Sequence, residues 1–247
     1  VNVESGELSR EKYKELGEKV LARYADEVVT LSEEMHQYFL DTYGRDTALV
    51  KNAISIIPPT DDHLLREAYG LEKGSYILYI GRLSPEKGPQ DLIAAYKRAG
   101  VSQKLVIAGE MPDNDFGREL TALIDGDENI VLPGFVSGDI MHALYSSCAL
   151  YVLPSHTEGL ALTLLEAMSC GANCLVSDIV ENTAVLGDFG HAFAVSDIDD
   201  LARALRESVD DTRLPEAVDA QIAHIREHYS YDRVIDEMMT IYRKVKK

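Results

Sequence analysis

From about residue 75 onward, short apolar runs alternate with longer segments in which apolar residues recur every three or four positions. The short runs predict buried strands and the longer segments predict amphipathic helices. Strands are expected at 76–81, 104–109, 129–132, 149–153, 173–177 and 191–194, with helices near 89–99, 114–125, 138–147, 159–170 and 197–208. This alternation predicts an α/β fold, a Rossmann-like parallel sheet with helices on both faces.

Right-handed crossovers between parallel strands bring the carboxyl ends of those strands to one edge of the sheet. The loops that lie at this edge follow residues 81, 109, 132, 153 and 177. Open α/β sheets bind their ligands at that edge, so the chemistry of these loops is the first place to look for a site.

The beginning and the end of the chain do not continue the alternation. The first part predicts a charged helix from Ser9 to Tyr24, a strand from Val28 to Leu31, a helix from Glu33 to Tyr43 and a strand-like exit from Ala48 to Ile57. The last part, from Ser230 to Lys247, also lies outside the alternation. Two strands are too few for a second domain of the same kind.

The segment after the strand at 149–153 carries two acids eight residues apart, Glu158 and Glu166, in an otherwise apolar stretch. A helix that begins near Gly159 would present its first N–H groups to an anion beyond the strand end. Eight helical residues rise roughly 12 Å and leave the two carboxylates about 80° apart, broadly on one side. The layout suits a ligand with a phosphate in the middle and hydroxyl groups at each end. Alternatively, such a pair is an ordinary solvated helix face.

A second motif follows the strand at 76–81, where Gly81 leads into a loop that carries Arg82 and Lys87 and ends at Gly88. Arginine offers a planar fork for phosphate oxygens and lysine a mobile charge, so the pair suits a diphosphate. The alternative is that both are surface charges paired with Glu86 or Asp91.

Together the two motifs resemble family 4 of the retaining glycosyltransferases, which have the GT-B fold. The family's G-R-x-x-x-x-K-G loop corresponds to Gly81–Gly88, and its E-G-x-x-L-x-x-L-E-A-M-x-x-G helix to Glu158–Gly171. Pro133-Gly134-Phe135-Val136 is similar to the segment that cups the nucleotide base. The likeness extends over nearly the whole chain from about residue 10 onward. One departure is that Leu160-Ala161 stands where Phe-Gly is frequent, which leaves the identity of the sugar open.

The resemblance implies transfer of a sugar from a nucleotide diphosphate, with UDP favoured over GDP on family frequency, to an acceptor hydroxyl with retention. Arg82 and Lys87 would neutralise the leaving phosphates, and Glu158 would hold sugar hydroxyls near the oxocarbenium ion. Glu166 would accept both ribose hydroxyls. The other expected substrate-binding residues are the loop glycine, the base-cupping residues and the start of the helix: Gly81, Phe135, Val136, Gly159, Leu160, Ala161, Leu162, Thr163 and Leu164.

The resemblance also predicts the organisation of the chain. Residues 1–57 would be the remnant of an amino-terminal acceptor domain with its linker, 58–229 the donor-binding domain and 230–247 the crossover helix. We therefore expect either a fragment or a naturally shortened relative, in which a missing amino-terminal domain packs on the donor domain. The implied role is synthesis of cell-surface or extracellular polysaccharides or glycoconjugates, with an unknown acceptor.

Composition narrows the choice of partners. The formal net charge of −18 argues against nucleic acid and against tight binding to anionic lipid, so membrane contact would be peripheral at most. No run of 18 or more apolar residues occurs. The three cysteines, Cys148, Cys170 and Cys174, form no C-x-x-C pair, which favours free thiols in a reducing cytoplasm.

No D-x-D motif follows a strand, and the family resemblance implies metal-independent chemistry, so no cofactor is expected beside the nucleotide-sugar substrate. His156, two residues before Glu158, is a candidate for direct participation or for loop packing. Two other functions stay open. One is a nucleotide-sugar-binding module without turnover. The other is a sugar-nucleotide epimerase of GT-B architecture, although such enzymes lack this combination of the two motifs.

Overall fold

The computed structural model describes residues 10–56, 58 and 60–246, and these form two compact units. The larger unit runs from Ile54 to Ser230, and the smaller combines the described residues up to Ala53 with those from Tyr231 onward. The predicted divisions, after residues 57 and 229, lie at slightly different positions. The physical reason is that Ile54 forms a parallel β-bridge with Ser230, which ties both residues to the larger unit.

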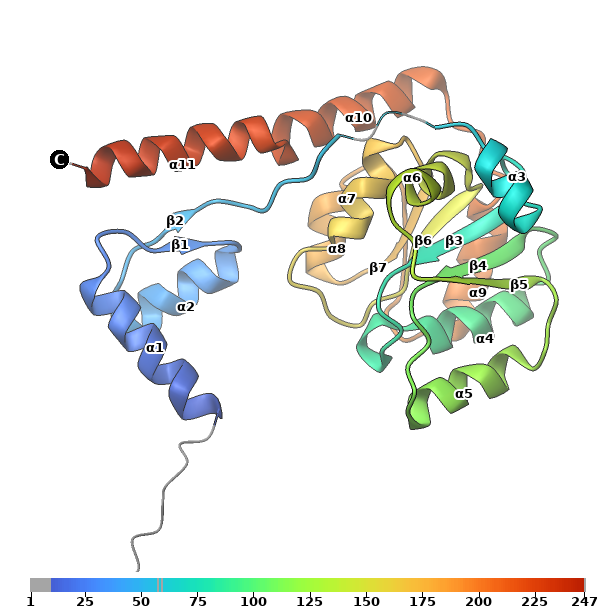
Figure 1. Ribbon diagram of the computed structural model, residues 1–247, viewed down its shortest axis with the longest axis horizontal. Coiled ribbons are helices and arrows are strands. Elements are labelled where there is room, and N and C mark those ends of the chain that lie inside the picture. The colour runs from blue at the N-terminus through green and yellow to red at the C-terminus, as the bar shows by residue number, and fades with distance from the viewer. Residues whose placement is uncertain (1–9, 57, 59, 247) are drawn as a thin grey trace, which may run out of the picture. The chain divides into compact units, whose positions relative to one another are not determined.

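The larger unit is built on a six-stranded parallel sheet with strand order β5-β4-β3-β6-β7-β8, which confirms the predicted fold class (Figure 1). The strands are β3 (Tyr76–Ile80), β4 (Lys104–Ala108), β5 (Ile130–Gly134), β6 (Leu150–Leu153), β7 (Cys174–Ser177) and β8 (His191–Phe193). The chain adds strands outward from β3 to β5, then crosses back so that β6 pairs with β3. The strand order reverses between β3 and β6, which is where open α/β sheets have their ligand crevice.

Helices cover both faces of this sheet, and the alternation of side chains along β3 shows how. Tyr76, Leu78 and Ile80 belong to one buried cluster, whereas Ile77 and Tyr79 belong to the other. The first cluster packs under α3 (His63–Tyr69), α6 (Gly138–Ser147), α7 (Leu162–Ser169), α8 (Val180–Leu186) and α10 (Pro215–Tyr229). The second packs under α4 (Pro89–Ala99), α5 (Asp115–Ile124) and α9 (Ile198–Ser208).

The structure corrects several predicted boundaries. The helix expected at 159–170 begins only at Leu162, because Ala161 has ψ near 85°, outside the helical region. Residues 159–161 therefore belong to the loop. Hydrophobic periodicity also missed α3, α8 and α10, of which the first two are only seven residues long. The strand-like exit at 48–57 contains the two-residue strand β2 (Ala48–Leu49), and its end at Ile57 lies outside the described residues.

The smaller unit contains α1 (Arg10–Tyr24), β1 (Val29–Thr30), α2 (Glu33–Tyr43), β2 and α11 (Tyr231–Val245). The predicted start of the first helix at Ser9 lies outside the described residues. β1 and β2 pair in parallel. Ser32 caps α2 by accepting a hydrogen bond from the Met35 N–H, and Lys244 of α11 pairs with Glu27 at 2.9 Å. Throughout the described residues, no helix combines the length and the apolar character that crossing a bilayer requires.

Gly88 connects the loop after β3 to the end of β6. It ends a short 3₁₀ turn, Pro85–Lys87, and caps α4 with φ of +70°. A Cβ at this position would lie 2.2 Å from the carbonyl oxygen of Pro154. Only glycine permits both the left-handed backbone and this close approach.

We expect Gly88→Ala to lower the free energy of unfolding by about 2–4 kcal/mol, because it combines backbone strain with a clash against a carbonyl. Gly100→Ala is the matched control. Gly100 has φ of +63° but no atom within 4 Å of its Cβ position, so strain alone applies and the loss should be about 1 kcal/mol. Urea denaturation measures both. Equal losses would mean that the contact with Pro154 does not constrain the loop.

Candidate functional site

The site lies where the loops after β3 and β6 meet. Besides the close approach of Gly88 to Pro154, the His156 N–H donates to the carbonyl of Glu86 at 2.9 Å. The two predicted motifs are therefore neighbours in space, although more than 60 residues of sequence separate them. The edge predicted from the crossover rule is the edge where they meet.

Lys87 and Glu158 form an ion pair across this junction. The Lys87 Nζ lies 2.7 Å from Glu158 Oε2, and the two side chains are only 19 % and 8 % exposed. The Ser155 hydroxyl, itself fully buried, donates to the other oxygen, Oε1, at 2.7 Å. The alternative in which Lys87 pairs with Glu86 or Asp91 is thereby wrong. A carboxylate held this way is both desolvated and hydrogen-bonded, which is the arrangement in which burying a charge is tolerated.

Arg82 behaves differently from Lys87. Its side chain is 79 % exposed, and its Nη2 lies 3.8 Å from Glu86 Oε1, a distance at the outer limit of an ion pair. Glu86 also accepts a hydrogen bond from the Ser84 hydroxyl at 2.7 Å, and this bond holds the pKa of Glu86 below its ordinary value. For Arg82, the alternative of a surface charge paired with Glu86 agrees with the structure, although the ion pair is long.

His156 does not point at Glu158 as a catalytic partner. Its Nε2 lies 2.6 Å from Asp91 Oδ2, at the start of α4, and the pair is partly buried. The contact fastens the loop after β6 to the first turn of α4. Of the two roles considered for His156, the geometry favours loop packing.

Two adjoining cavities form a cleft along this edge of the sheet. A cavity of about 350 Å³ is lined by Lys87, Glu158 and the loop before α7. A larger one of about 780 Å³ is lined by Phe135, Val136 and Glu166, together with residues after β4. Ile80, Gly81, Arg82 and Thr163 line both cavities. The basic loop and the start of α7 therefore lie between the two carboxylates, as a ligand with a central phosphate requires.

Most of the predicted site residues line this cleft, but not in the same way. Phe135 is 78 % exposed, whereas Val136 is buried. The side chain of Leu164 packs in the core beneath α7, and Gly159 is not among the residues that line either cavity. Within the first turn of α7, the N–H groups of Leu162 and Leu164 donate to the carbonyls of Leu160 and Ala161.

Glu166 lies in the larger cavity with one carboxylate oxygen already engaged. The Tyr145 hydroxyl donates to Glu166 Oε2 at 3.0 Å. Burial raises the pKa of the Glu166 carboxyl, while the bond from Tyr145 and the nearby His142 oppose that shift. That Glu166 accepts both ribose hydroxyls stays a prediction; without a ligand, its Oε2 already accepts a hydrogen bond from Tyr145.

Sequence reasoning missed the residues of the cleft that lie outside the two motifs. They include Met111, Pro112, Asp113 and Asn114 in the loop after β4, together with Met141. Tyr145 and Ser155 were missed as well; they do not line the cleft but donate hydrogen bonds to Glu166 and Glu158. The loop after residue 109 did lie on the predicted ligand-binding edge, and this was the available signal. No group of three or more His, Cys, Asp or Glu side chains able to hold a metal occurs among the residues that the structure describes.

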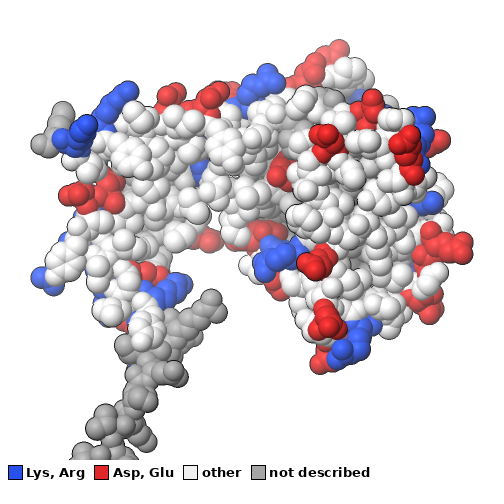
Figure 2. All heavy atoms as spheres, in the orientation of Figure 1, with Lys and Arg blue, Asp and Glu red and all other residues white. Residues whose placement is uncertain are grey.

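Charge on the visible surface is mixed. Figure 2 shows acidic and basic side chains interspersed on this face, with no broad basic area. The net charge of −18 gives an overall field that does not attract anions, so the predicted binding of an anion would require local basic groups such as Arg82 and Lys87.

Comparison with known proteins relates this chain to glycosyltransferases. A family model described as "Glycosyl transferases group 1" matches residues 61–224. The alpha-D-kanosaminyltransferase of Streptomyces kanamyceticus is 28% identical over 187 residues, which cover 73% of this chain and 48% of that protein. The O-antigen chain mannosyltransferase B of Escherichia coli is 26% identical over 182 residues, covering 72% and 48%. The chain thus spans about half the length of these curated relatives.

Solved structures share the fold. The HepE protein of Anabaena, in complex with UDP and glucose, superposes with a TM-score of 0.79 at 21% identity over 94% of this chain and 66% of that one. The sucrose-phosphate synthase of Thermosynechococcus elongatus gives a TM-score of 0.78 at 21% identity over 98% and 64%.

The raised pKa of Glu166 has a consequence for stability. Between the ordinary pKa of an unfolded glutamate and the raised native pKa, the native state binds more protons, so stability falls as pH rises through that window. We expect Glu166→Gln to raise the free energy of unfolding at pH 7 relative to the natural chain. The gain should shrink as pH falls toward 4. Urea denaturation at several pH values measures it, with Glu119→Gln on α5 as control. A gain that is independent of pH would contradict this reading.

Proposed function

This chain belongs to the group 1 glycosyl transferases, and from that premise we propose that its cleft binds a nucleotide diphosphate sugar whose sugar is transferred to an acceptor hydroxyl. The observation that carries the proposal is the order of groups along the cleft. Glu158 lies at the smaller cavity, Glu166 lies at the larger one, and Arg82 with the start of α7 lies between them. A nucleotide sugar has the matching order of sugar, diphosphate and ribose.

The chemistry follows from charge development. Departure of the nucleotide leaves negative charge on the diphosphate and positive charge on the sugar ring. Arg82 and Lys87 would stabilise the former, and Glu158 would stabilise the latter. Phe135 and Val136 would bound the base. We propose retention at the anomeric carbon and chemistry without a metal, in keeping with the family 4 motifs.

UDP is the proposed nucleotide. Support comes from the structural neighbour with the same fold that was determined with UDP and glucose. A role in cell-surface or extracellular glycans is supported by the relative named as an O-antigen chain mannosyltransferase. We also propose a cytoplasmic location, which fits the three free cysteines of the described residues. The donor sugar and the acceptor are not assigned.

We propose that the smaller unit, with its α11, is the part of the chain that joins an acceptor-binding domain to the donor-binding unit. Its helices carry exposed apolar side chains. On α11 these residues recur at helical spacing and are all more than two-fifths exposed: Tyr231, Ile235, Met239 and Tyr242. A similar exposed row on α1 contains Tyr13, Leu16, Val20 and Tyr24. Faces of this kind are typical of surfaces that pack against another domain.

The second candidate function is nucleotide-sugar binding without turnover. This function would use the same cleft, and it differs from sugar transfer only in that no acceptor site is needed. Production of free or transferred sugar from a UDP-sugar, in the presence and absence of candidate acceptors, separates the two.

Arg82→Ala and Lys87→Ala should each weaken binding of UDP by about ten- to a hundred-fold while affecting uridine much less, since charge-assisted hydrogen bonds contribute roughly 1.5–3 kcal/mol each. Isothermal calorimetry with UDP, GDP and uridine measures this. Arg98→Ala is the control, because Arg98 pairs with Asp199 on the surface of α4. Unchanged UDP affinity in both variants would remove the phosphate assignment.

Glu158→Gln should tighten binding of bare UDP by about two- to ten-fold, because the variant no longer neutralises Lys87 and the diphosphate meets a free cation. The same variant should lose affinity for the intact UDP-sugar relative to UDP and lose turnover, since the carboxylate is needed as the ring becomes cationic. Calorimetry with UDP and with a UDP-sugar measures both changes in affinity. Glu119→Gln removes the same charge from α5 and controls for net charge. Weaker UDP binding in Glu158→Gln would mean that the ion pair does not compete with the diphosphate.

A further inference from the structure

We infer that Tyr145 is a positioning residue for ribose recognition, holding one oxygen of Glu166 so that the other faces the ligand. The inference rests on the proposed function, because it assigns the ribose to Glu166. Tyr145 does not line the cleft itself and would act only through the carboxylate.

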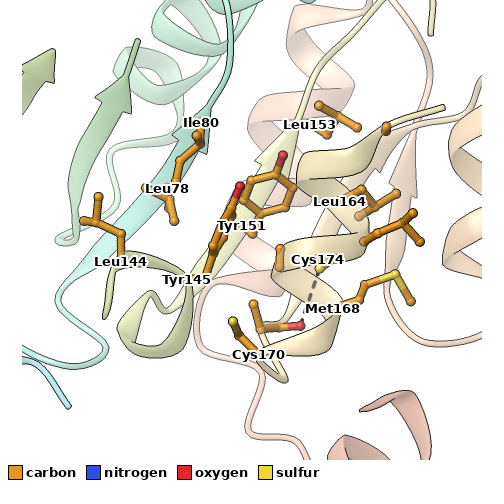
Figure 3. Close-up of a cluster of buried hydrophobic side chains, with 14 of the residues drawn as sticks. Leu78, Ile80, Leu144, Tyr145, Tyr151, Leu153, Leu164, Met168, Cys170 and Cys174 are labelled. Atoms are coloured by element: carbon orange, nitrogen blue, oxygen red, sulfur yellow. Dashed lines mark hydrogen bonds between the residues drawn. The ribbon is translucent and has the colours of Figure 1, made fainter. Parts of the chain in front are cut away.

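The geometry gives Tyr145 a single orientation. Its side chain is fully buried in the core between α6, β6 and α7, and its ring packs against that of Tyr151, with centroids 5.7 Å apart and planes at 62°. Figure 3 shows both rings standing side by side, with their hydroxyl groups directed to the same end of the cluster. A buried phenol packed in this way has little freedom to turn, so its O–H is a preorganised donor.

The two tyrosines each support one polar residue of the cleft. The Tyr145 hydroxyl donates to Glu166 Oε2 at 3.0 Å, and the Tyr151 hydroxyl donates to Thr163 Oγ1 at 2.9 Å. Glu166 forms no ion pair with a Lys or Arg anywhere in the described part of the chain. The phenol of Tyr145 is therefore the contact that fixes the carboxylate while leaving Oε1 available to accept from a hydroxyl.

The same hydrogen bond affects the charge of Glu166. Burial raises the pKa of the carboxyl, and donation from Tyr145 opposes the rise because it favours the ionised form. The other groups that interact with Glu166 are His142 on α6 and the thiol of Cys170. Without the Tyr145 hydroxyl, the pKa of Glu166 should rise further, and a larger share of the protein would carry a protonated acid that accepts hydrogen bonds poorly.

Tyr145→Phe tests the inference, because it removes the hydroxyl and keeps the ring that packs on Tyr151. We expect about ten-fold weaker binding of UDP at pH 7, measured by calorimetry. As pH falls, the loss of affinity should begin at a higher pH than in the natural chain. A carboxyl NMR titration of Glu166 in the free protein should show the same upward shift of its pKa, which a purely structural role would not produce.

Tyr76→Phe is the matched control. Tyr76 is also fully buried, and its hydroxyl donates to the backbone carbonyl of Leu144 at 2.8 Å, with no carboxylate involved. It should lower stability without moving the pKa of Glu166 or the pH dependence of UDP binding.

The variant Glu166→Gln separates the inference from the proposed function. If Glu166→Gln weakens UDP binding and Tyr145→Phe adds nothing further in the double variant, Tyr145 acts through Glu166 as inferred. If Glu166→Gln weakens binding but Tyr145→Phe changes neither affinity nor the pKa of Glu166, the inference is overturned and the ribose assignment stands. If Glu166→Gln leaves UDP affinity unchanged, the ribose assignment fails and the inference fails with it.

Discussion

The pairing of β3 with β6 is the contact on which the rest of the site depends. Because these strands are parallel and neighbours in the sheet, both of their carboxyl ends reach the same edge. The basic loop after β3 and the acidic loop after β6 are thereby brought within hydrogen-bonding distance, as the contact of His156 with Glu86 shows. Had the chain continued outward from β5, two strands would separate the loop after β6 from the loop after β3, and the two motifs would not meet.

Within that frame, a buried ion pair sets the electrostatics of the smaller cavity. Lys87 and Glu158 satisfy each other, and Ser155 completes the coordination of the carboxylate. Such a pair is a weak source of stability because desolvation offsets the attraction. If the cleft binds a nucleotide sugar as proposed, the diphosphate would compete with Glu158 for Lys87. A diphosphate that binds Lys87 would break the ion pair, and Glu158 would then be available to the sugar of the same ligand.

The acid in the larger cavity is held differently from the acid in the smaller one. Glu166 forms no ion pair with a Lys or Arg of the described residues, and its carboxylate accepts a hydrogen bond from a buried tyrosine instead. The raised pKa of this carboxyl reflects a cost in stability that the native structure carries. Functional sites commonly contain groups of this kind, in which an interaction is left incomplete until the ligand is present. The two acids of the E-x7-E motif thus differ in environment as well as in position.

The sequence alone determined the fold class, five of the eight described helices of the larger unit, and the edge where the site lies. Hydrophobic periodicity and the crossover rule were sufficient for these, because both can be read along the chain. It also indicated Arg82, Lys87, Glu158 and Glu166 through their spacing and family likeness. Only the tertiary structure decided that Lys87 pairs with Glu158, that α7 begins at Leu162, and that Tyr145 and Ser155 support the two acids. These contacts join residues from separate elements, and the distances between their atoms depend on how the helices pack on the sheet. No periodicity along the chain encodes that packing.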